Sequence, residues 1–97
     1  MKDKLLEIIN HYGIDKQLKY IHSEYFELDE AIIIEKDRVS HMKTKNWQTD
    51  HIVEEIADVM CMLKQFQYYY GISDEEVEKI MNEKIDRQLE RIKDESK

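Results

Sequence analysis

The 97-residue sequence has no proline, only two glycines, Gly13 and Gly71, and a single cysteine, Cys61. Proline and glycine are the residues that interrupt helices most strongly, so their scarcity leaves long stretches free to be helical. One cysteine excludes an intrachain disulfide and gives no sign of an oxidising compartment. Charged residues (38%) and hydrophobic residues (41%) alternate at helical spacing, which predicts one all-α domain over residues 1–97 with a charged tail from about residue 93.

The sequence also lacks a long hydrophobic run. The apolar stretch in MKDKLLEIIN is broken by Glu7 and Asn10, so we expect neither a signal peptide nor a membrane span, and hence a cytoplasmic protein. The formal net charge of −7 argues against a nucleic acid polymer or an anionic membrane as partner. A small anionic ligand, held by a metal ion or a local basic cluster, remains compatible with this charge.

Four helical segments are predicted, at about residues 2–11, 15–36, 50–70 and 73–92. Gly13 and Gly71 act as stops, Ser73 and Glu76 form a capping box, and residues 37–49 are predicted to be a connecting loop, either irregular or with a short helical piece. In the second and third segments, apolar residues recur at alternating steps of four and three, as in heptad packing. These two seams are Ile14, Leu18, Ile21, Tyr25, Leu28, Ile32 and Ile52, Ile56, Val59, Leu63, Phe66, Tyr70.

This pattern predicts a four-helix bundle-like domain with heptad-packed helices. A chain this short buries a modest fraction of its surface, and Tyr68, Tyr69 and Tyr70 cannot all face inward on one helix. We therefore expect the domain to associate into a homo-oligomer.

Two pairs of acidic residues flank the seams in the same way. Glu24 and Glu27 on the second segment, and Glu55 and Asp58 on the third, each sit one position before a seam residue. Side chains three apart share one helix face, so the two pairs can face each other if the helices pack seam to seam. Four such carboxylates suit Mg²⁺ or Mn²⁺, with substrate phosphates completing the coordination. The alternative is that they are surface charges making salt bridges.

The histidines do not support another kind of metal site. A di-iron centre in a helical bundle needs a glutamate three residues before a histidine on each of two helices, and none of the four histidines has an acid there. His51 lies one turn before Glu55 and either orients that carboxylate or is an exposed or capping residue.

The arrangement Glu24-x-x-Glu27-Leu28, a loop, then Glu55-x-x-Asp58 resembles the ExxE…ExxD pattern of MazG-like all-α nucleoside triphosphate pyrophosphohydrolases. The wider matches are GIDKQLKYIHSE, EYFELDEAI, HIVEEIADVM and NEKIDRQLERI, which cover most of the chain from Gly13 to Ile92. One departure is Ser23, because the family often has a second acid just before the first motif. Ser23 puts in doubt an extra metal ligand or base at that position.

The resemblance implies a helical homodimer or homotetramer that cleaves an NTP or dNTP to the monophosphate and pyrophosphate with Mg²⁺, for which Mn²⁺ is a possible substitute. It implies that the four acids bind the metal and that Lys84 and Arg87 hold the phosphates. Asn82 also matches, although it lies about 200° from Lys84 around a helix.

The residues themselves add further candidates. Arg91 continues the row of Lys84 and Arg87 at steps of three and four, and this row either binds phosphates or makes salt bridges. Glu27, and after it Glu54, are candidates for the general base that takes a proton from the attacking water. Trp47 either stacks on a nucleobase or closes the end of the bundle.

Two other functions stay open at this point. One is a related enzyme of phosphoribosyl-ATP pyrophosphohydrolase type, which shares the acid-motif bundle, although the segment from Lys84 to Arg87 favours the first interpretation. The other is a non-catalytic helical interaction module whose acids are only surface charge.

Overall fold

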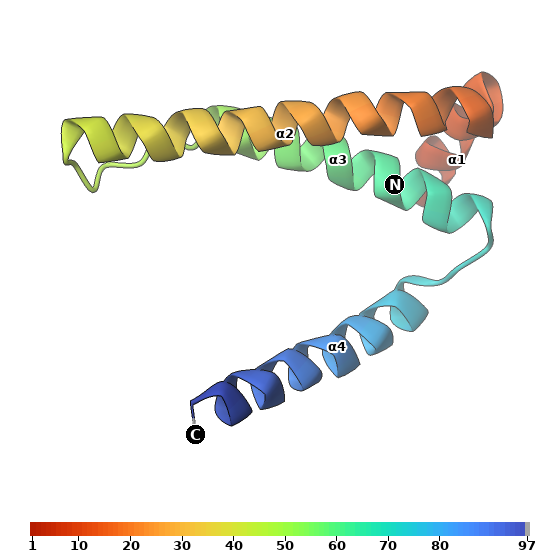
Figure 1. The fold of residues 1–97 in the computed structure, drawn as a ribbon. Helices are drawn as coiled ribbons and strands as arrows, with labels where there is room; N and C mark the ends of the chain where they lie inside the picture. Colours follow the sequence, from red (N-terminus) through yellow and green to blue (C-terminus); the bar gives the residue numbers. More distant parts are fainter. Residues whose placement is uncertain (97) are drawn as a thin grey trace.

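The structure, a computed structural model, describes residues 1–96 and is all-α, with no strand in that part of the chain (Figure 1). Its helices are α1 (Lys2–Tyr12), α2 (Ile14–Met42), α3 (Asp50–Tyr69) and α4 (Asp74–Glu95). The predicted all-α class and the number of helices are thus confirmed, whereas the predicted packing of four helices in one bundle is not formed by the described residues of the single chain, because α4 makes no packing contact with α1, α2 or α3. In residues 1–96 no helix combines the length and the apolar character that crossing a membrane requires.

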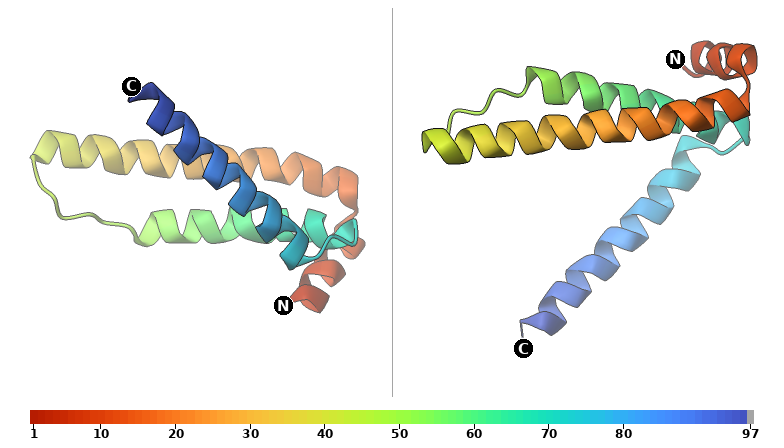
Figure 2. Two further views of the ribbon diagram at one scale, coloured as in Figure 1. Left: turned by 90° about the horizontal axis from the view of Figure 1, so that it is seen from below. Right: turned by 45° about the horizontal axis from the view of Figure 1, so that its top comes forward.

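Helices α2 and α3 run antiparallel, side by side (Figures 1 and 2). Helix α1 packs against the end of this pair where α2 begins and α3 ends. Gly13 joins α1 to α2 with a φ of 89°, a conformation that L side chains rarely adopt, so a glycine belongs at this corner. Leu5 and Ile9 of α1 are buried. At the same end, Gln17 donates a hydrogen bond of 2.7 Å from Nε2 to Oε1 of Gln65, which ties α2 to α3 inside the core.

Only one side of each predicted seam is buried in the contact between α2 and α3. In α2 the seam residue Ile21 is buried, whereas Leu18, Tyr25 and Ile32 remain about half exposed. The buried residues of α2 and α3 are Gln17, Ile21, Ala31, Glu35, Glu55, Val59, Met62, Gln65 and Tyr68. The contact between the helices is therefore rotated toward the acidic flank of each seam, because within one chain each seam meets a single long helix.

Helix α2 is longer than the sequence predicts. It continues through residues 37–42 to Met42, and only residues 43–49 form the connection to α3. Lys43 ends the helix in the left-handed conformation with a φ of 50°. The extension is held by Arg38, whose guanidinium donates to the Glu35 carboxylate at 2.8 and 2.9 Å.

Helix α4 stands away from the other helices (Figures 1 and 2). Its capping box of Ser73 and Glu76 is present as predicted. Within residues 1–96, no Cα atom of α4 comes within 8 Å of a Cα atom of α1, α2 or α3. Its first residue, Asp74, accepts hydrogen bonds from the Lys64 and Tyr68 side chains of α3. The single chain thus consists of a packed three-helix unit and one projecting helix.

Candidate metal centre

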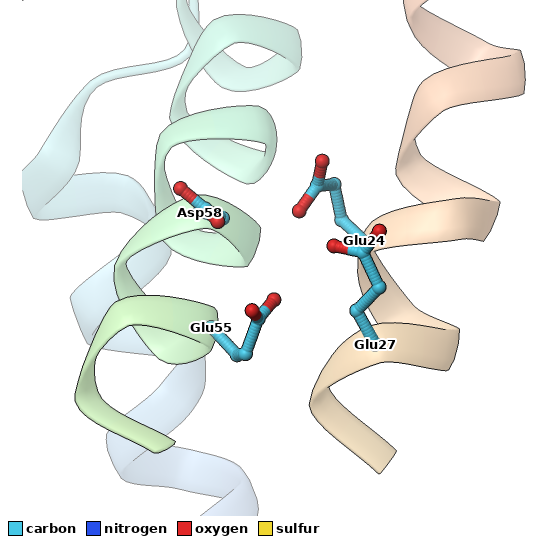
Figure 3. A group of neighbouring side chains, drawn as sticks. All are labelled: Glu24, Glu27, Glu55 and Asp58. Atoms are coloured by element: carbon cyan, nitrogen blue, oxygen red, sulfur yellow. The ribbon is translucent and has the colours of Figure 1, made fainter. Parts of the chain in front are cut away.

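The antiparallel packing of α2 against α3 brings the four predicted acids together (Figure 3). One carboxylate oxygen from each of Glu24, Glu27, Glu55 and Asp58 lies within 4.8 Å of the others. The i, i+3 spacing places each pair on one face of its own helix, and the helix contact then sets the two faces opposite each other. The expectation that the two acidic flanks meet is therefore confirmed.

The cluster is buried on one side and open on the other. Glu55 is buried and Glu24 is half-buried, whereas Glu27 and Asp58 are exposed. One oxygen of Glu24 and one of Glu55, Oε2 in both residues, are buried without a hydrogen-bond partner among the described residues. A buried carboxylate oxygen without a partner is costly, and a cation or a proton at this point removes the cost.

The electrostatics of the cluster favour the same conclusion. Burial, followed by the nearby carboxylate of Glu27, raises the pKa of Glu24 above its usual value. Burial and then Glu27 likewise raise the pKa of Glu55, which His51 partly opposes. Four hard oxygen donors without a thiolate suit Mg²⁺ or Mn²⁺ rather than a soft metal. The residues present thus fit the metal that the resemblance implies.

His51 lies at the edge of the cluster. Its Nδ1 atom is 3.8 Å from Oε1 of Glu55 and 4.0 Å from Oε2 of Glu54. The Glu54 side chain is 78% exposed, and its carboxylate does not belong to the four-residue cluster. His51 therefore contacts a cluster carboxylate from outside, while the role of Glu54 as a base stays a prediction.

A cavity of about 590 Å³ lies beside the cluster at the junction of α2, the connecting loop and α3. Its lining includes Trp47 and His51, and His51 links it to Glu55 of the cluster. Trp47 is 62% exposed, so in the single chain it lines this cavity without closing the end of the helix pair. The cavity is large enough for an organic group next to the carboxylates.

Hydrogen bonds between α2 and the connecting loop, which the sequence did not predict, shape this cavity. Glu35 accepts a hydrogen bond of 2.7 Å from the backbone N–H of Gln48, and Arg38 donates to the carbonyl oxygen of Asn46 at 2.7 Å. The Arg38 hydrogen bond and then that from Gln48 lower the pKa of Glu35 to about 2. A signal was present in the sequence, because Glu35 stands seven residues after Leu28 and so continues the seam with an acid.

The predicted phosphate-binding residues lie elsewhere in the single chain. Lys84, Arg87 and Arg91 share one side of α4 and, with Gln88, line a small hollow of about 130 Å³. Asn82 is also exposed on α4. Because α4 projects away from α2 and α3, the chain by itself does not bring these residues to the carboxylates.

Comparisons of the chain with protein-family models, with curated proteins and with solved structures gave no match.

Proposed function

We propose that the chain is a Mg²⁺-dependent nucleotide pyrophosphohydrolase, which cleaves an NTP or dNTP to the nucleoside monophosphate and pyrophosphate. One observation carries this proposal: the cluster of Glu24, Glu27, Glu55 and Asp58 contains two buried oxygens that have no hydrogen-bond partner within residues 1–96. A cluster that served only as surface charge has no need to bury such oxygens. A divalent cation satisfies them and leaves the exposed side of the cluster open for phosphates.

The four carboxylates hold Mg²⁺ in this proposal. When bound, Mg²⁺ supplies positive charge to the phosphate oxygens and makes water more acidic. Glu24 and Glu55 anchor the site from its buried side, where their orientation is set by the contact between α2 and α3. Glu27 is exposed at the mouth of the cluster and accepts the proton of the attacking water, with Glu54 as the alternative base.

The remaining parts of the substrate are assigned to the cavity and to α4. The nucleobase enters the cavity beside the cluster, where Trp47 offers a ring for stacking. Lys84, Arg87 and Arg91 bind phosphates through charge-assisted hydrogen bonds, as the resemblance implies. This last assignment requires an arrangement of α4 other than the one in the single chain, such as that of a homodimer or homotetramer.

The test is release of pyrophosphate from a panel of NTPs and dNTPs with Mg²⁺. We expect at least one nucleotide to be hydrolysed by the wild-type chain, and the Glu55→Gln, Asp58→Asn double variant to lose the activity. The Glu30→Gln variant, which removes a charge from an exposed position of α2 outside the cluster, serves as the matched control. If the panel is left intact in the presence of Mg²⁺ or Mn²⁺, the proposal fails and the non-catalytic interaction module gains support.

A further inference from the structure

A second cavity, of about 550 Å³, lies along the first turns of α2. Every side chain that lines it is charged or carries a hydroxyl group: Asp15, Lys16, Lys19, Tyr20 and Ser23. Neither lysine forms an ion pair within residues 1–96, since no carboxylate oxygen there lies within 4.0 Å of either ammonium nitrogen. The cavity therefore keeps two positive charges against the single carboxylate of Asp15.

Two tyrosine rings position the ammonium group of Lys16 in this cavity. Its Nζ atom lies 4.9 Å from the ring centre of Tyr12, the last residue of α1, and 6.0 Å from that of Tyr20. A ring attracts a cation through its negative face but carries no net charge, so it holds the ammonium without neutralising it. The charge of Lys16 thus remains available to an anion.

The second cavity lies on the side of α2 that carries the mouth of the acidic cluster. At 100° per residue, Lys16 and Tyr20 lie within about 20° of Glu27 around the helix, and Lys19 lies about 80° to one side. With a rise of 1.5 Å per residue, Lys19 stands about 12 Å from Glu27 along the axis, and the flexible four-carbon stem of lysine reaches across part of this distance. An anion next to the carboxylate cluster is therefore close to these ammonium groups.

The cavity that contains Trp47 lies on the same side of α2 in the opposite direction. Two of its lining residues, Ile34 and Arg38, also lie within about 20° of Glu27 around the helix, but they follow it by about 10 and 16 Å along the axis. One side of α2 thus presents, in order, the Trp47 cavity, the carboxylates and the second cavity. A nucleoside triphosphate has the same linear order of base, α-phosphate, and β- and γ-phosphates.

The charges of the two cavities decide the direction in which a nucleotide lies. The Trp47 cavity is lined by the carboxylates of Glu35 and Asp50. Its guanidinium, that of Arg38, already donates to Glu35 and to the carbonyl oxygen of Asn46. This cavity repels a polyphosphate, whereas the unpaired lysines of the second cavity attract one.

We propose that the second cavity binds the β- and γ-phosphates of the substrate through Lys16 and Lys19, while the base lies beside Trp47. The inference rests on the proposed function and adds these two cations to those of α4, without requiring another arrangement of that helix. It makes the second cavity the site of the pyrophosphate leaving group, on the same chain as the four carboxylates.

The position of the lysines matches the charge that the reaction develops. Water adds to the α-phosphorus as Glu27 takes its proton, and the bond from this phosphorus to the oxygen that bridges to the β-phosphorus breaks. That oxygen leaves with the electron pair as part of pyrophosphate. The ammonium groups of Lys16 and Lys19 stabilise the negative charge that the leaving group gains.

The first test is binding of inorganic pyrophosphate in the presence of Mg²⁺, measured by isothermal titration calorimetry. The Lys16→Gln, Lys19→Gln double variant should bind pyrophosphate about tenfold more weakly or worse, because it loses charge-assisted hydrogen bonds. Lys36→Gln is the matched control, since Lys36 is exposed on α2 about 180° away from Glu27. Its affinity for pyrophosphate should equal that of wild type.

Two further titrations separate this role from a general effect on the site. Mn²⁺ binding without phosphate should stay within about twofold in the double variant at 0.15 M salt, because the lysines lie beyond the Debye length of about 8 Å from the cluster. Nucleoside monophosphates with Mg²⁺ should bind the double variant as they bind wild type. Trp47→Ala should show the reverse pattern, with weaker binding of monophosphates and unchanged binding of pyrophosphate.

The outcomes that overturn the inference are distinct from those that overturn the proposed function. The subsite is wrong if wild type does not bind pyrophosphate with Mg²⁺, or if the double variant binds it as tightly as wild type. It is also wrong if the double variant loses monophosphate binding and keeps pyrophosphate binding, because the nucleotide then lies in the opposite direction. A chain that binds pyrophosphate through Lys16 and Lys19 but hydrolyses no nucleotide overturns the proposed function and retains the second cavity as a pyrophosphate site.

Discussion

The substitution Glu55→Gln should change the stability of the chain in opposite directions with and without a divalent cation. Without metal, burial and the Glu27 carboxylate raise the pKa of Glu55 in the folded state. A raised pKa means that the folded chain holds the proton more tightly than the unfolded chain does. Because pH 7 lies above the usual pKa of a glutamate, the carboxyl group of Glu55 costs stability there, and the neutral glutamine removes that cost while keeping the shape of the side chain. We expect a higher melting temperature for the metal-free variant.

The pH dependence follows with the same sign. The cost of the ionised carboxylate appears as the pH rises above 4.5, the usual pKa of a glutamate, and is complete once the pH exceeds the raised folded pKa. Below pH 4.5 the carboxyl group is protonated in both states and the cost is absent. The advantage of the Glu55→Gln variant should therefore be larger at pH 7 than at pH 4.5 and should shrink as the pH falls.

With metal, the order of stability should reverse. A ligand at a hundred times its dissociation constant stabilises the folded state by about 2.7 kcal/mol. For a domain of this size each kcal/mol shifts the melting temperature by about 4–8 °C, so wild type should gain about 11–22 °C. The variant lacks one of the two carboxylates that anchor the site from its buried side and should lose most of this gain.

The assay is thermal unfolding followed by circular dichroism at one protein concentration, with EDTA and with Mn²⁺. The control is Glu30→Gln, which makes the same chemical change at an exposed position of α2 and should keep the full gain with Mn²⁺. An equal Mn²⁺ shift in wild type and Glu55→Gln would refute the reasoning, because the cluster then does not bind the ion. A Glu55→Gln variant that melts below wild type in EDTA would refute the argument that the Glu55 carboxylate costs stability without metal.

Three further outcomes follow from contacts outside the cluster. Ile9 is 0% exposed, so Ile9→Ala should cost about 2–5 kcal/mol of unfolding free energy, measured by urea titration. The pKa of Glu35 is lowered to about 2, so its carboxylate stabilises the folded chain above the usual pKa of 4.5, and this stability is lost as the pH falls toward 2. Glu35→Gln should therefore lower the melting temperature at pH 7 and reduce the fall in melting temperature between pH 4.5 and pH 2. The hydrogen bond from Lys64 is the main cause of the lowered pKa of Asp74, which shows that this ion pair ties the start of α4 to α3. Asp74→Asn weakens the tie and should speed amide hydrogen exchange in the first turn of α4, measured by mass spectrometry, while exchange at Ile9 stays unchanged.

The helices were predictable where their ends carry local signals. Gly13, and the capping box of Ser73 and Glu76, stand where the sequence analysis placed them, because these signals act through neighbouring backbone groups. The end of α2 was not predictable in the same way. Residues 37–42 have no regular apolar spacing, and the helix continues there because Arg38 pairs with Glu35 and with the connecting loop.

The acidic cluster was predictable from spacing, whereas the inside of the helix pair was not. The positions of Glu24 and Glu55, each one step before a seam residue, indicated that the two acids could face each other, and the rotation of the helix contact toward these flanks brings them together. Gln17 and Gln65 lie off the seams and are polar, yet they are buried and joined across the core by the hydrogen bond from Gln17 Nε2 to Gln65 Oε1. Such a pair depends on the rotation of both helices about their axes, which the spacing of apolar residues does not determine.

That rotation connects the candidate site to the apolar side chains that the helix pair leaves exposed. One neighbouring helix covers only part of the apolar stripe that steps of four and three produce. A helix with a single neighbour therefore leaves one side of its stripe exposed. In this chain both helices turn their acidic flank inward, which buries Glu55 and half-buries Glu24 while Tyr25 and Ile56 stay exposed. The same helix rotation thus assembles the carboxylates and leaves Tyr25 and Ile56 exposed. A substitution that rotated α3 to bury Ile56 within its own chain should therefore weaken Mn²⁺ binding, although it would change none of the four carboxylates.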